Sequence, residues 1–382
     1  MKPSFDRLRR QLLIQCLALP AGVGPALAAI AAPANQAAGN RLLEPRPLRF
    51  PGDHGSHNDA RTEWWYLTGW LQDEAQRLYG FQVTFFRSRV DPAQGLKSRL
   101  AARQLLFAHA ALTDLAGRAH WHDQALARWN GEPAAWPEPQ ASAAVQDTDV
   151  RLRGWRLQRQ SDGGAYRTEI RARDFALALD AQPTQALLLQ GERGWSRKGP
   201  QPEQASQYYS QPQLRLSGQV RLGQRNLPVR GRAWLDHEWS EELLHPEAIG
   251  WDWIGINLDD GASLTAFRLR RADGSALWAG GSWRPAGGGP ARIFQPGEVA
   301  FEPLRHWSSP VTGIRYPLEW RVTTPAGRFR VAALLDAQEL DSRRSTGAIY
   351  WEGLSELRAA DGGQRLGLGY LELTGYGGRL AL

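Results

Sequence analysis

The sequence predicts an all-β fold of antiparallel strands. Segments in which apolar and polar residues alternate outnumber segments of helical periodicity, and turn signals such as Asp162-Gly163-Gly164 and Asp259-Asp260-Gly261 separate them. The chain has 382 residues, of which 42% are hydrophobic and 22% charged, so it can form two globular domains with sizeable cores. Many short strands at regular spacing favour barrels or sandwiches.

The expected strands follow one another along most of the chain. Their ranges are 63–71, 79–87, 104–113, 155–159, 166–172, 175–179, 214–222, 229–239, 251–258, 263–270, 318–323, 328–334, 349–356 and 366–374. Two Pro/Gly-rich stretches, 131–139 and 285–290, are expected to be surface loops.

The N-terminus has the pattern of an export signal. A basic stretch from Arg7 to Arg10 precedes an apolar run from 12 to 32, and Ala26-Leu27-Ala28 fits a cleavage site. We therefore expect a signal peptide at 1–28, a low-complexity linker at 29–45, and a periplasmic or secreted protein exported by the Sec or twin-arginine route. No later segment is long and apolar enough for a transmembrane span.

Charge and cysteine content exclude several classes of function. The net charge of +7 comes almost entirely from scattered arginine, because lysine occurs only at 2, 97 and 198, so we expect no nucleic-acid partner. The only cysteine, Cys16, lies within the predicted signal peptide. The mature chain therefore offers no disulfide, no thiol nucleophile and no thiolate metal ligand.

Carboxylates set among aromatic residues are the most informative pattern. Glu63 precedes three consecutive large aromatics, and Asp236-His237-Glu238 lies between Trp234 and Trp239. A carboxylate on aromatic surface must be paired or have its pKa raised by desolvation. The 17 Trp either line cavities or fill β-cores. We expect these carboxylates to lie inside dry, aromatic-lined barrels.

Strand alternation predicts which side chains share a face. On the first expected strand, Glu63 and Trp65 face one side, with Glu63 at the mouth of a cavity or just inside it, and Trp64 and Tyr66 face the other. On the later strand, Trp234, Asp236 and Glu238 share one face and His237 and Trp239 the other, so a regular strand keeps Asp236 and His237 out of the same pocket.

Other titratable groups give weaker signals. His54 and His57 are three apart beside carboxylates, but they lie in a Gly/Asn/Ser loop without the helical His-Glu-x-x-His spacing, so we predict no metal site. His109, within an apolar strand, is either structural or lines a pocket. The chain has no Gly-x-Ser-x-Gly elbow and no phosphate-cradling glycine loop, and we predict no cofactor.

Segments spread over nearly the whole mature chain share the pattern of one family. They are 53–57 (Asp-His-Gly-Ser-His), 62–69 (Thr-Glu-Trp-Trp-Tyr-Leu-Thr-Gly), 79–87, 108–110, 233–240 (Ala-Trp-Leu-Asp-His-Glu-Trp-Ser), 250–258, 338–340, 350–353 and 369–376. Together they resemble the AttH-like and carotenoid 1,2-hydratase (hydroxyneurosporene synthase) family of lipocalin-like proteins. The resemblance implies two lipocalin-like β-barrels, at 46–240 and 241–382, and a cavity for an extended apolar molecule.

The resemblance also implies two functions. The first is a cofactor-free hydratase or isomerase of an isoprenoid or lipid, with an aspartate as acid, which we match to Asp236. The second is a periplasmic carrier or accessory protein of an AttH-type ABC export system, with the transporter permease as partner; such proteins are often labelled secreted hydrolases. The export signal resembles the AttH-like branch more than the pigment hydratases.

Acid catalysis is chemically consistent with these residues. Adding water to an unactivated C=C begins with protonation at carbon by a neutral carboxylic acid, and aromatic faces stabilise the carbocation by about 1–2 kcal/mol each. We expect Trp65, Trp239, Trp251 and Tyr350 to provide these faces. The predicted catalytic residues are Asp236, Glu63, Glu238 and His237. The predicted ligand-binding residues are Trp64, Trp65, Tyr66, His109, Trp239, Trp251, Trp253, Tyr350 and Glu352.

One structural observation distinguishes the two functions. A pocket that holds a desolvated carboxyl without a basic partner favours chemistry. A dry pocket in which every carboxylate is paired to arginine favours carriage.

Overall fold

A computed structural model of the chain describes residues 43–132, 140–242, 244–360 and 363–379. The predicted signal peptide and most of the predicted linker lie outside these residues. Residues from 42 onward belong to one compact unit. In the described part of the chain, no helix is long and apolar enough to cross a membrane.

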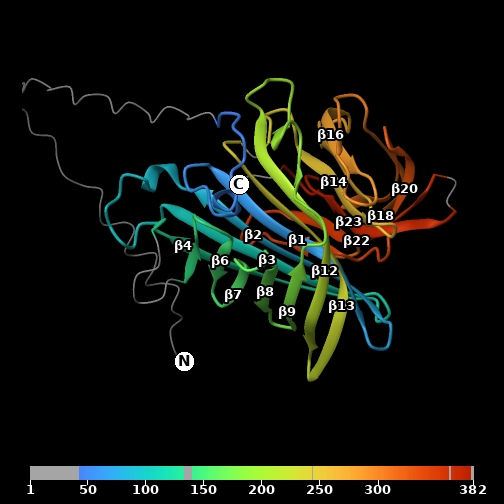
Figure 1. The fold of residues 1–382 in the computed structure, drawn as a ribbon, viewed down its shortest axis with the longest axis horizontal. Coiled ribbons are helices and arrows are strands. Elements are labelled where there is room, and N and C mark those ends of the chain that lie inside the picture. Colours follow the sequence, from blue (N-terminus) through green and yellow to red (C-terminus); the bar gives the residue numbers. More distant parts are fainter. Residues whose placement is uncertain (1–42, 133–139, 243, 361–362, 380–382) are drawn as a thin grey trace, which may run out of the picture. The chain divides into compact units, whose positions relative to one another are not determined.

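The prediction of an all-β fold is confirmed. The described helical segments are two short 3-10 turns, η1 (Gly52–His54) and η2 (Asp91–Ala93), and two antiparallel sheets contain the strands (Figure 1). The first sheet follows the path β4-β3-β2-β1-β13-β12-β9-β8-β7-β6-β5, with β10 and β11 paired to β12. Its strands are β1 (Thr62–Asp73), β2 (Leu78–Arg89), β3 (Gln104–Asp114), β4 (Ala119–Trp129), β5 (Ala141–Ala143), β6 (Asp149–Leu152), β7 (Trp155–Arg159), β8 (Tyr166–Arg171), β9 (Phe175–Gln182), β10 (Leu188–Leu189), β11 (Trp195–Arg197), β12 (Ala205–Leu222) and β13 (Arg225–Ser240).

The second sheet begins after residue 249 and follows the path β17-β16-β15-β14-β23-β22-β20-β19-β18, with β21 paired to β22. Its strands are β14 (Gly250–Leu258), β15 (Ser263–Arg270), β16 (Ala276–Arg284), β17 (Arg292–Phe294), β18 (Ala300–Ser308), β19 (Arg315–Thr324), β20 (Gly327–Ala333), β21 (Glu339–Asp341), β22 (Ile349–Ala359) and β23 (Arg365–Leu373).

Each sheet curls around its own hydrophobic core. In the first sheet the terminal strands β4 and β5 contact each other, and the core inside contains Trp65, Leu67 and Trp239. In the second sheet the terminal strands contribute Phe294 and Phe301 to one core around Trp320, which requires the sheet to curl back on itself. The inside of each curled sheet is therefore packed with side chains.

The two sheets meet along their middle strands. β1 contacts β23, β2 contacts β22 and β13 contacts β14. Figure 1 shows the blue strands β1 and β2 next to the red strands β22 and β23. A third hydrophobic cluster fills part of this junction and includes Tyr66, Trp234, Trp253 and Tyr370. The outer face of the first sheet is thus covered here by the second sheet.

The close pairing of β1 with β13 depends on Gly69. Gly69 lies opposite Ala233, and a Cβ at Gly69 would meet the backbone of Arg232 and Ala233. Backbone cannot move aside as a flexible side chain can, so any larger residue must push the strands apart.

We therefore expect Gly69→Ala to lower the free energy of unfolding by about 1–3 kcal/mol, measured by urea denaturation. Gly95→Ala is the matched control, because a Cβ there meets no atom within 4 Å and the backbone has no positive φ. Equal stability of the two variants would contradict the close approach of β1 and β13.

Candidate functional site

A cavity of about 110 Å³ lies between the two sheets and is partly open to the outside. Both sheets contribute to its walls, which include eight Phe, Tyr or Trp residues and five acidic residues. The residues that line it are Trp64, Tyr66, Thr84, Phe86, His109, Lys198, Ser206, Tyr208, Asp236, Glu238, Ser240, Glu242, Leu244, Trp251, Trp253, Phe267, Leu269, Thr346, Tyr350, Glu352, Glu372 and Thr374.

Strand register arranges the cavity residues in rows. In the first sheet Tyr66 on β1 lies opposite Asp236 on β13, and Trp64 lies opposite Glu238. In the second sheet Glu352 on β22 lies opposite Glu372 on β23, which in turn lies opposite Trp253 on β14. Residues two apart on a strand share a face, so each sheet presents a continuous patch of acidic and aromatic groups to the other.

Asp236 is the most perturbed acid on the first-sheet side of the cavity. It is 3% exposed, and no Arg, Lys or His of the described residues forms an ion pair with it. Its oxygens accept hydrogen bonds from Tyr208 Oη at 2.7 Å, Ser210 Oγ at 2.5 Å and Trp234 Nε1 at 2.6 Å. Burial raises the pKa of Asp236 to about 7, although these three hydrogen bonds oppose the rise.

Two further carboxyls, Glu352 and Glu372, face the cavity from the second sheet. Burial raises the pKa of Glu372 to about 7. Burial, together with the charge of neighbouring Glu372, raises the pKa of Glu352 well above its usual range. Two carboxyls directly opposite each other on neighbouring strands, of which Glu352 is buried, cannot both be ionised at low cost, so this pair retains a proton near neutral pH.

Lys198 provides a positive charge at the cavity wall. Its ammonium lies 2.9 Å from a carboxylate oxygen of Glu238, and it also lies over the rings of Tyr208 and Phe267, at 4.7 Å and 4.4 Å from their centroids. Glu238 also accepts a hydrogen bond from Ser206 Oγ. Glu238 is therefore compensated, whereas Asp236, Glu352 and Glu372 are not.

His109 and Tyr350 connect the two sheets beside the cavity. His109 Nδ1 is 2.7 Å from the Tyr350 hydroxyl, and its Nε2 is 2.8 Å from Ser345 Oγ. Burial lowers the pKa of His109 to about 3, so the ring is neutral. His109 therefore has both of the roles that the sequence left open: it is structural and it lines the cavity.

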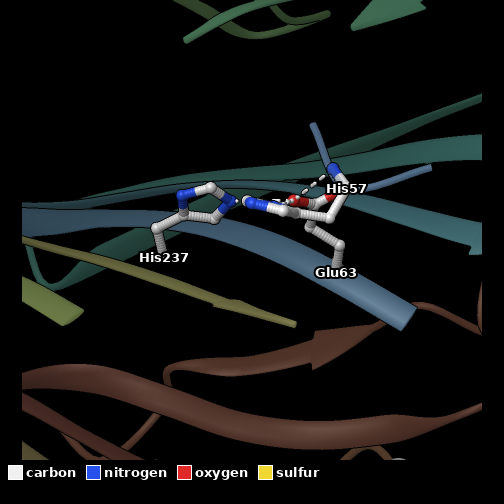
Figure 2. A group of neighbouring side chains, drawn as sticks. All are labelled: His57, Glu63 and His237. Atoms are coloured by element: carbon white, nitrogen blue, oxygen red, sulfur yellow. Dashed lines mark hydrogen bonds and ion pairs between the residues drawn. The ribbon is translucent and has the colours of Figure 1, made fainter. Parts of the chain in front are cut away.

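Glu63 lies on the opposite face of β1, inside the first sheet. Figure 2 shows its carboxylate between the rings of His57 and His237. Its Oε1 is 2.8 Å from His57 Nδ1 and 2.9 Å from His237 Nε2, and Arg87 Nε donates to its Oε2 at 2.8 Å. Burial alone would raise the pKa of Glu63, but Arg87 and the two imidazoles hold it well below its usual range.

The far nitrogens of the two imidazoles have partners as well. His57 Nε2 is 3.0 Å from Asp53, and His237 Nδ1 is 3.0 Å from the Tyr209 hydroxyl. The hydrogen bonds that the His57 ring donates to Asp53 and Glu63 raise the pKa of His57 despite burial, whereas burial lowers the pKa of His237 to about 4. We call Asp53, His57, Glu63, Arg87 and His237 the inner ion cluster.

The inner ion cluster has the dimensions of a metal site, because ligand atoms of His57, Glu63 and His237 lie within 4.8 Å of one another. Both nitrogens of each ring and both oxygens of Glu63 nevertheless have hydrogen-bonding partners within the protein. The chemistry of the cluster is therefore that of a buried ionic network, which fixes the 52–58 segment to the end of the first sheet.

These positions correct part of the predicted site. Glu63, His237, Trp65 and Trp239 do not line the cavity: the first two belong to the inner ion cluster, and the two tryptophans belong to the first core. The expected location of the carboxylates inside a barrel was also wrong for Asp236 and Glu238, since the barrel interiors are packed and the cavity lies between the sheets. The cause is that the second sheet covers the outer face of β1 and β13, so both faces of these strands are buried.

The other predicted residues do line the cavity: Asp236, Glu238, Trp64, Tyr66, His109, Trp251, Trp253, Tyr350 and Glu352. Sequence reasoning missed Glu372, Tyr208 and Lys198. For Glu372 a signal was present, because it lies among aromatic residues in the quoted segment 369–376. Tyr208 and Lys198 gave no motif and reach the cavity only through the pairing of β12 and β11.

Comparison with known proteins agrees with this geometry. The model of the AttH-like family matches residues 41–376. The chain belongs to the AttH-like family. A Nitrosomonas europaea structure provisionally assigned as AttH is 46% identical, with a TM-score of 0.79, over 88% of this chain and 99% of that one. A search of curated protein sequences found no match.

More distant structures share the fold of this AttH-like chain. Kievitone hydratase from Nectria haematococca is 13% identical, with a TM-score of 0.63, over 88% of this chain and 94% of that one. CghA, solved with Sch210972, is 12% identical, with a TM-score of 0.50, over 88% of this chain and 98% of that one. The predicted lipocalin-like class and the predicted family are thereby confirmed.

The inner ion cluster of this AttH-like protein predicts a stability effect. Glu63→Gln leaves Arg87 buried without its charge partner, so we expect the free energy of unfolding at pH 7 to fall by about 3–5 kcal/mol, measured by urea denaturation. Because the folded-state pKa of Glu63 is depressed, its contribution is present above the unfolded-state pKa and is lost as pH falls below it. The difference between wild type and variant should therefore shrink in acid.

Glu169→Gln is the control for this prediction, because Glu169 pairs with Arg167 on the surface, where the two side chains are 42% and 55% exposed. An exposed pair of this kind contributes at most about 1 kcal/mol. A Glu63→Gln protein as stable as the control would show that the inner ion cluster is not a source of stability.

Proposed function

We propose that this AttH-like protein is a cofactor-free, acid-catalysed hydratase or isomerase of an apolar isoprenoid or lipid molecule bound between the two sheets. The supporting observation is Asp236, a desolvated carboxyl without a basic partner, which faces an aromatic cavity and has a pKa of about 7. A carboxyl of this kind is protonated often enough near neutral pH to donate to carbon, and then accepts a proton back.

The cavity supplies the other groups that this chemistry needs. A carbocation formed by protonation would lie among the π-faces of Trp64, Trp251 and Tyr350, each of which stabilises it by about 1–2 kcal/mol. Trp65 and Trp239 have no such role, because they are in the first core. Glu238, held by Lys198, is the base that activates the attacking water, because it lines the cavity and Glu63 does not.

Carriage of a hydrophobic ligand for an ABC export system is the alternative. That function is best served by a pocket in which all carboxylates are paired, as Glu238 is with Lys198. The uncompensated Asp236, Glu352 and Glu372 support catalysis instead, since burying two of these acids, Asp236 and Glu352, without a cation is costly for a protein that only carries a ligand. Kievitone hydratase, a fold neighbour, shows that the fold can host a hydratase. Export remains a prediction from residues 1–28.

Asp236→Asn tests the acid role. We expect it to lower turnover of an apolar lipid extract by about 100-fold or more, because the amide cannot donate the proton. Turnover is measured by mass spectrometry as uptake of label from heavy-oxygen water or deuterated water. Wild-type turnover should fall as pH rises through about 7, where Asp236 loses its proton.

The same variant must still bind ligand, which is measured by native mass spectrometry with the lipid extract. Asp180→Asn is the control, because Asp180 is exposed on β9. Parallel loss of binding and turnover in Asp236→Asn would contradict an acid role and leave a part in ligand binding alone. Turnover that is unchanged in this variant would also refute the proposal.

A further inference from the structure

A second groove, of about 700 Å³, is open to solvent and shares no lining residue with the cavity. Strands β1, β12 and β13 of the first sheet border it, together with the connections that follow β9, β14 and β16. Its lining includes three arginines, Arg215 on β12 and Arg230 and Arg232 on β13. Among the described residues that line it there is no Asp or Glu. We call this feature the arginine groove.

Strand register brings the three arginines together on one face of the first sheet. Arg215 lies directly opposite Arg232 in the pairing of β12 with β13. Residues in this relation have Cβ atoms about 5 Å apart, and like charges at such positions are destabilising. Arg230 lies two residues before Arg232 on the same strand, so it shares this face. The arrangement therefore costs stability unless an anion compensates it.

No carboxylate in the described part of the chain forms an ion pair with any of the three. Arg232 Nη1 donates hydrogen bonds to Gln213 Oε1 and to the carbonyl oxygen of Leu258, both at 3.2 Å. These partners fix the guanidinium at the groove but carry no charge to cancel its own. The acid at the adjacent register position on this face is Asp180, which lies opposite Ser217 on β12 and does not line the groove.

A fourth guanidinium adds to the positive potential beside the groove. Arg284 is 6% exposed, and its Nη1 and Nη2 donate to the carbonyl oxygens of Ala186 and Leu187 at 2.6 Å and 2.7 Å. Ala186 is itself a lining residue of the groove. Burial lowers the pKa of Arg284, but a guanidinium stays protonated at neutral pH. A cleft surrounded by one sign of charge concentrates counter-ions within it.

The shape and chemistry of the arginine groove favour a small anion with more than one negative charge. A guanidinium is a planar fork of donors that matches two oxygens of a phosphate group. A singly charged ion would leave most of the positive charge uncompensated, whereas a phosphate or diphosphate group can contact two or three guanidiniums at once. A bilayer presents a broad surface, which does not enter a concave site.

We propose that the arginine groove binds a small, multiply charged anion, a phosphate or diphosphate group, between Arg215, Arg230 and Arg232. The site is independent of the reaction proposed for the cavity, since no residue lines both. It gives the protein a second ligand, of opposite chemical character to the apolar molecule between the sheets.

Calorimetric titration with sodium pyrophosphate at low ionic strength tests this site. We expect the wild type to bind one pyrophosphate per chain, and sodium chloride at the same ionic strength to give no saturable binding. Arg215→Gln and Arg230→Gln should each weaken binding at least about tenfold, because each removes a charge-assisted hydrogen bond. Both side chains are exposed, so we expect both variants to fold, which thermal melting checks.

Arg221→Gln is the matched control. Arg221 is exposed on the same strand as Arg215 and lines neither the groove nor the cavity, and its substitution changes the net charge by the same amount. This variant should keep the wild-type affinity. Pyrophosphate should raise the melting temperature of the wild type and of Arg221→Gln, and should raise that of Arg215→Gln much less, because a ligand stabilises only the folded protein that binds it.

Two results would overturn the inference. One is the absence of saturable pyrophosphate binding by the wild type; sedimentation with phosphatidylglycerol and phosphatidylcholine vesicles then shows whether the arginines contact a membrane surface instead. The other is equal weakening in Arg215→Gln and Arg221→Gln, which would mean that net charge alone attracts the anion. Neither result bears on the turnover assay of Asp236→Asn, which decides the proposed function separately.

Discussion

The two-residue period of β1 and β13 is the constraint on which the site depends. These strands pair in strict register, so Trp65 faces the same side as His237, and Tyr66 the same side as Asp236. One side of the pair closes over the first core and the inner ion cluster, and the other side faces the second sheet. A shift by a single residue would exchange the two sets and destroy both.

The same kind of side chain takes opposite roles on the two sides. Glu63 is fully buried, yet Arg87 and two imidazoles keep it ionised. Asp236 is also buried, but its partners are two hydroxyls and an indole. These groups stabilise its negative charge less than a cation does, so the effect of desolvation is larger and the pKa of Asp236 is raised. One face of the strand pair thus holds Glu63 ionised beside a guanidinium, whereas Asp236 on the other face has no cation as a partner and keeps a raised pKa.

The fold class and nine of the 22 cavity-lining residues could be predicted from the sequence, because alternation and turn residues are local properties. Alternation correctly separated Asp236 from His237, and Tyr66 from Glu63. What it could not show is which of the two faces meets water, and in this chain neither does at the centre of the strands. The partners of Glu63 illustrate the same limit, since Arg87 and His237 reach it only through the pairing of β1 with β2 and β13.

Glu372 and Lys198 mark a second limit. Glu372 can be recognised as a site residue only once the pairing of β23 with β22 places it opposite Glu352. Lys198 can be recognised only once the pairing of β11 with β12 brings it to Glu238. Neither relation is local in sequence. The family resemblance suggested a cavity but not its location, because a resemblance of motifs does not say between which layers a ligand lies.

The His109–Tyr350 hydrogen bond joins the first sheet to the second at the wall of the cavity. Both halves contribute acids to the cavity, Asp236 and Glu238 from the first sheet and Glu352 and Glu372 from the second, so the electrostatics of the cavity depend on how the two sheets meet. A small shift of one sheet relative to the other would change the pKa values of the cavity carboxyls and the distances between cavity groups, without any substitution of a cavity residue. Relatives of this chain can therefore differ in the electrostatics of this cavity through substitutions that lie far from it.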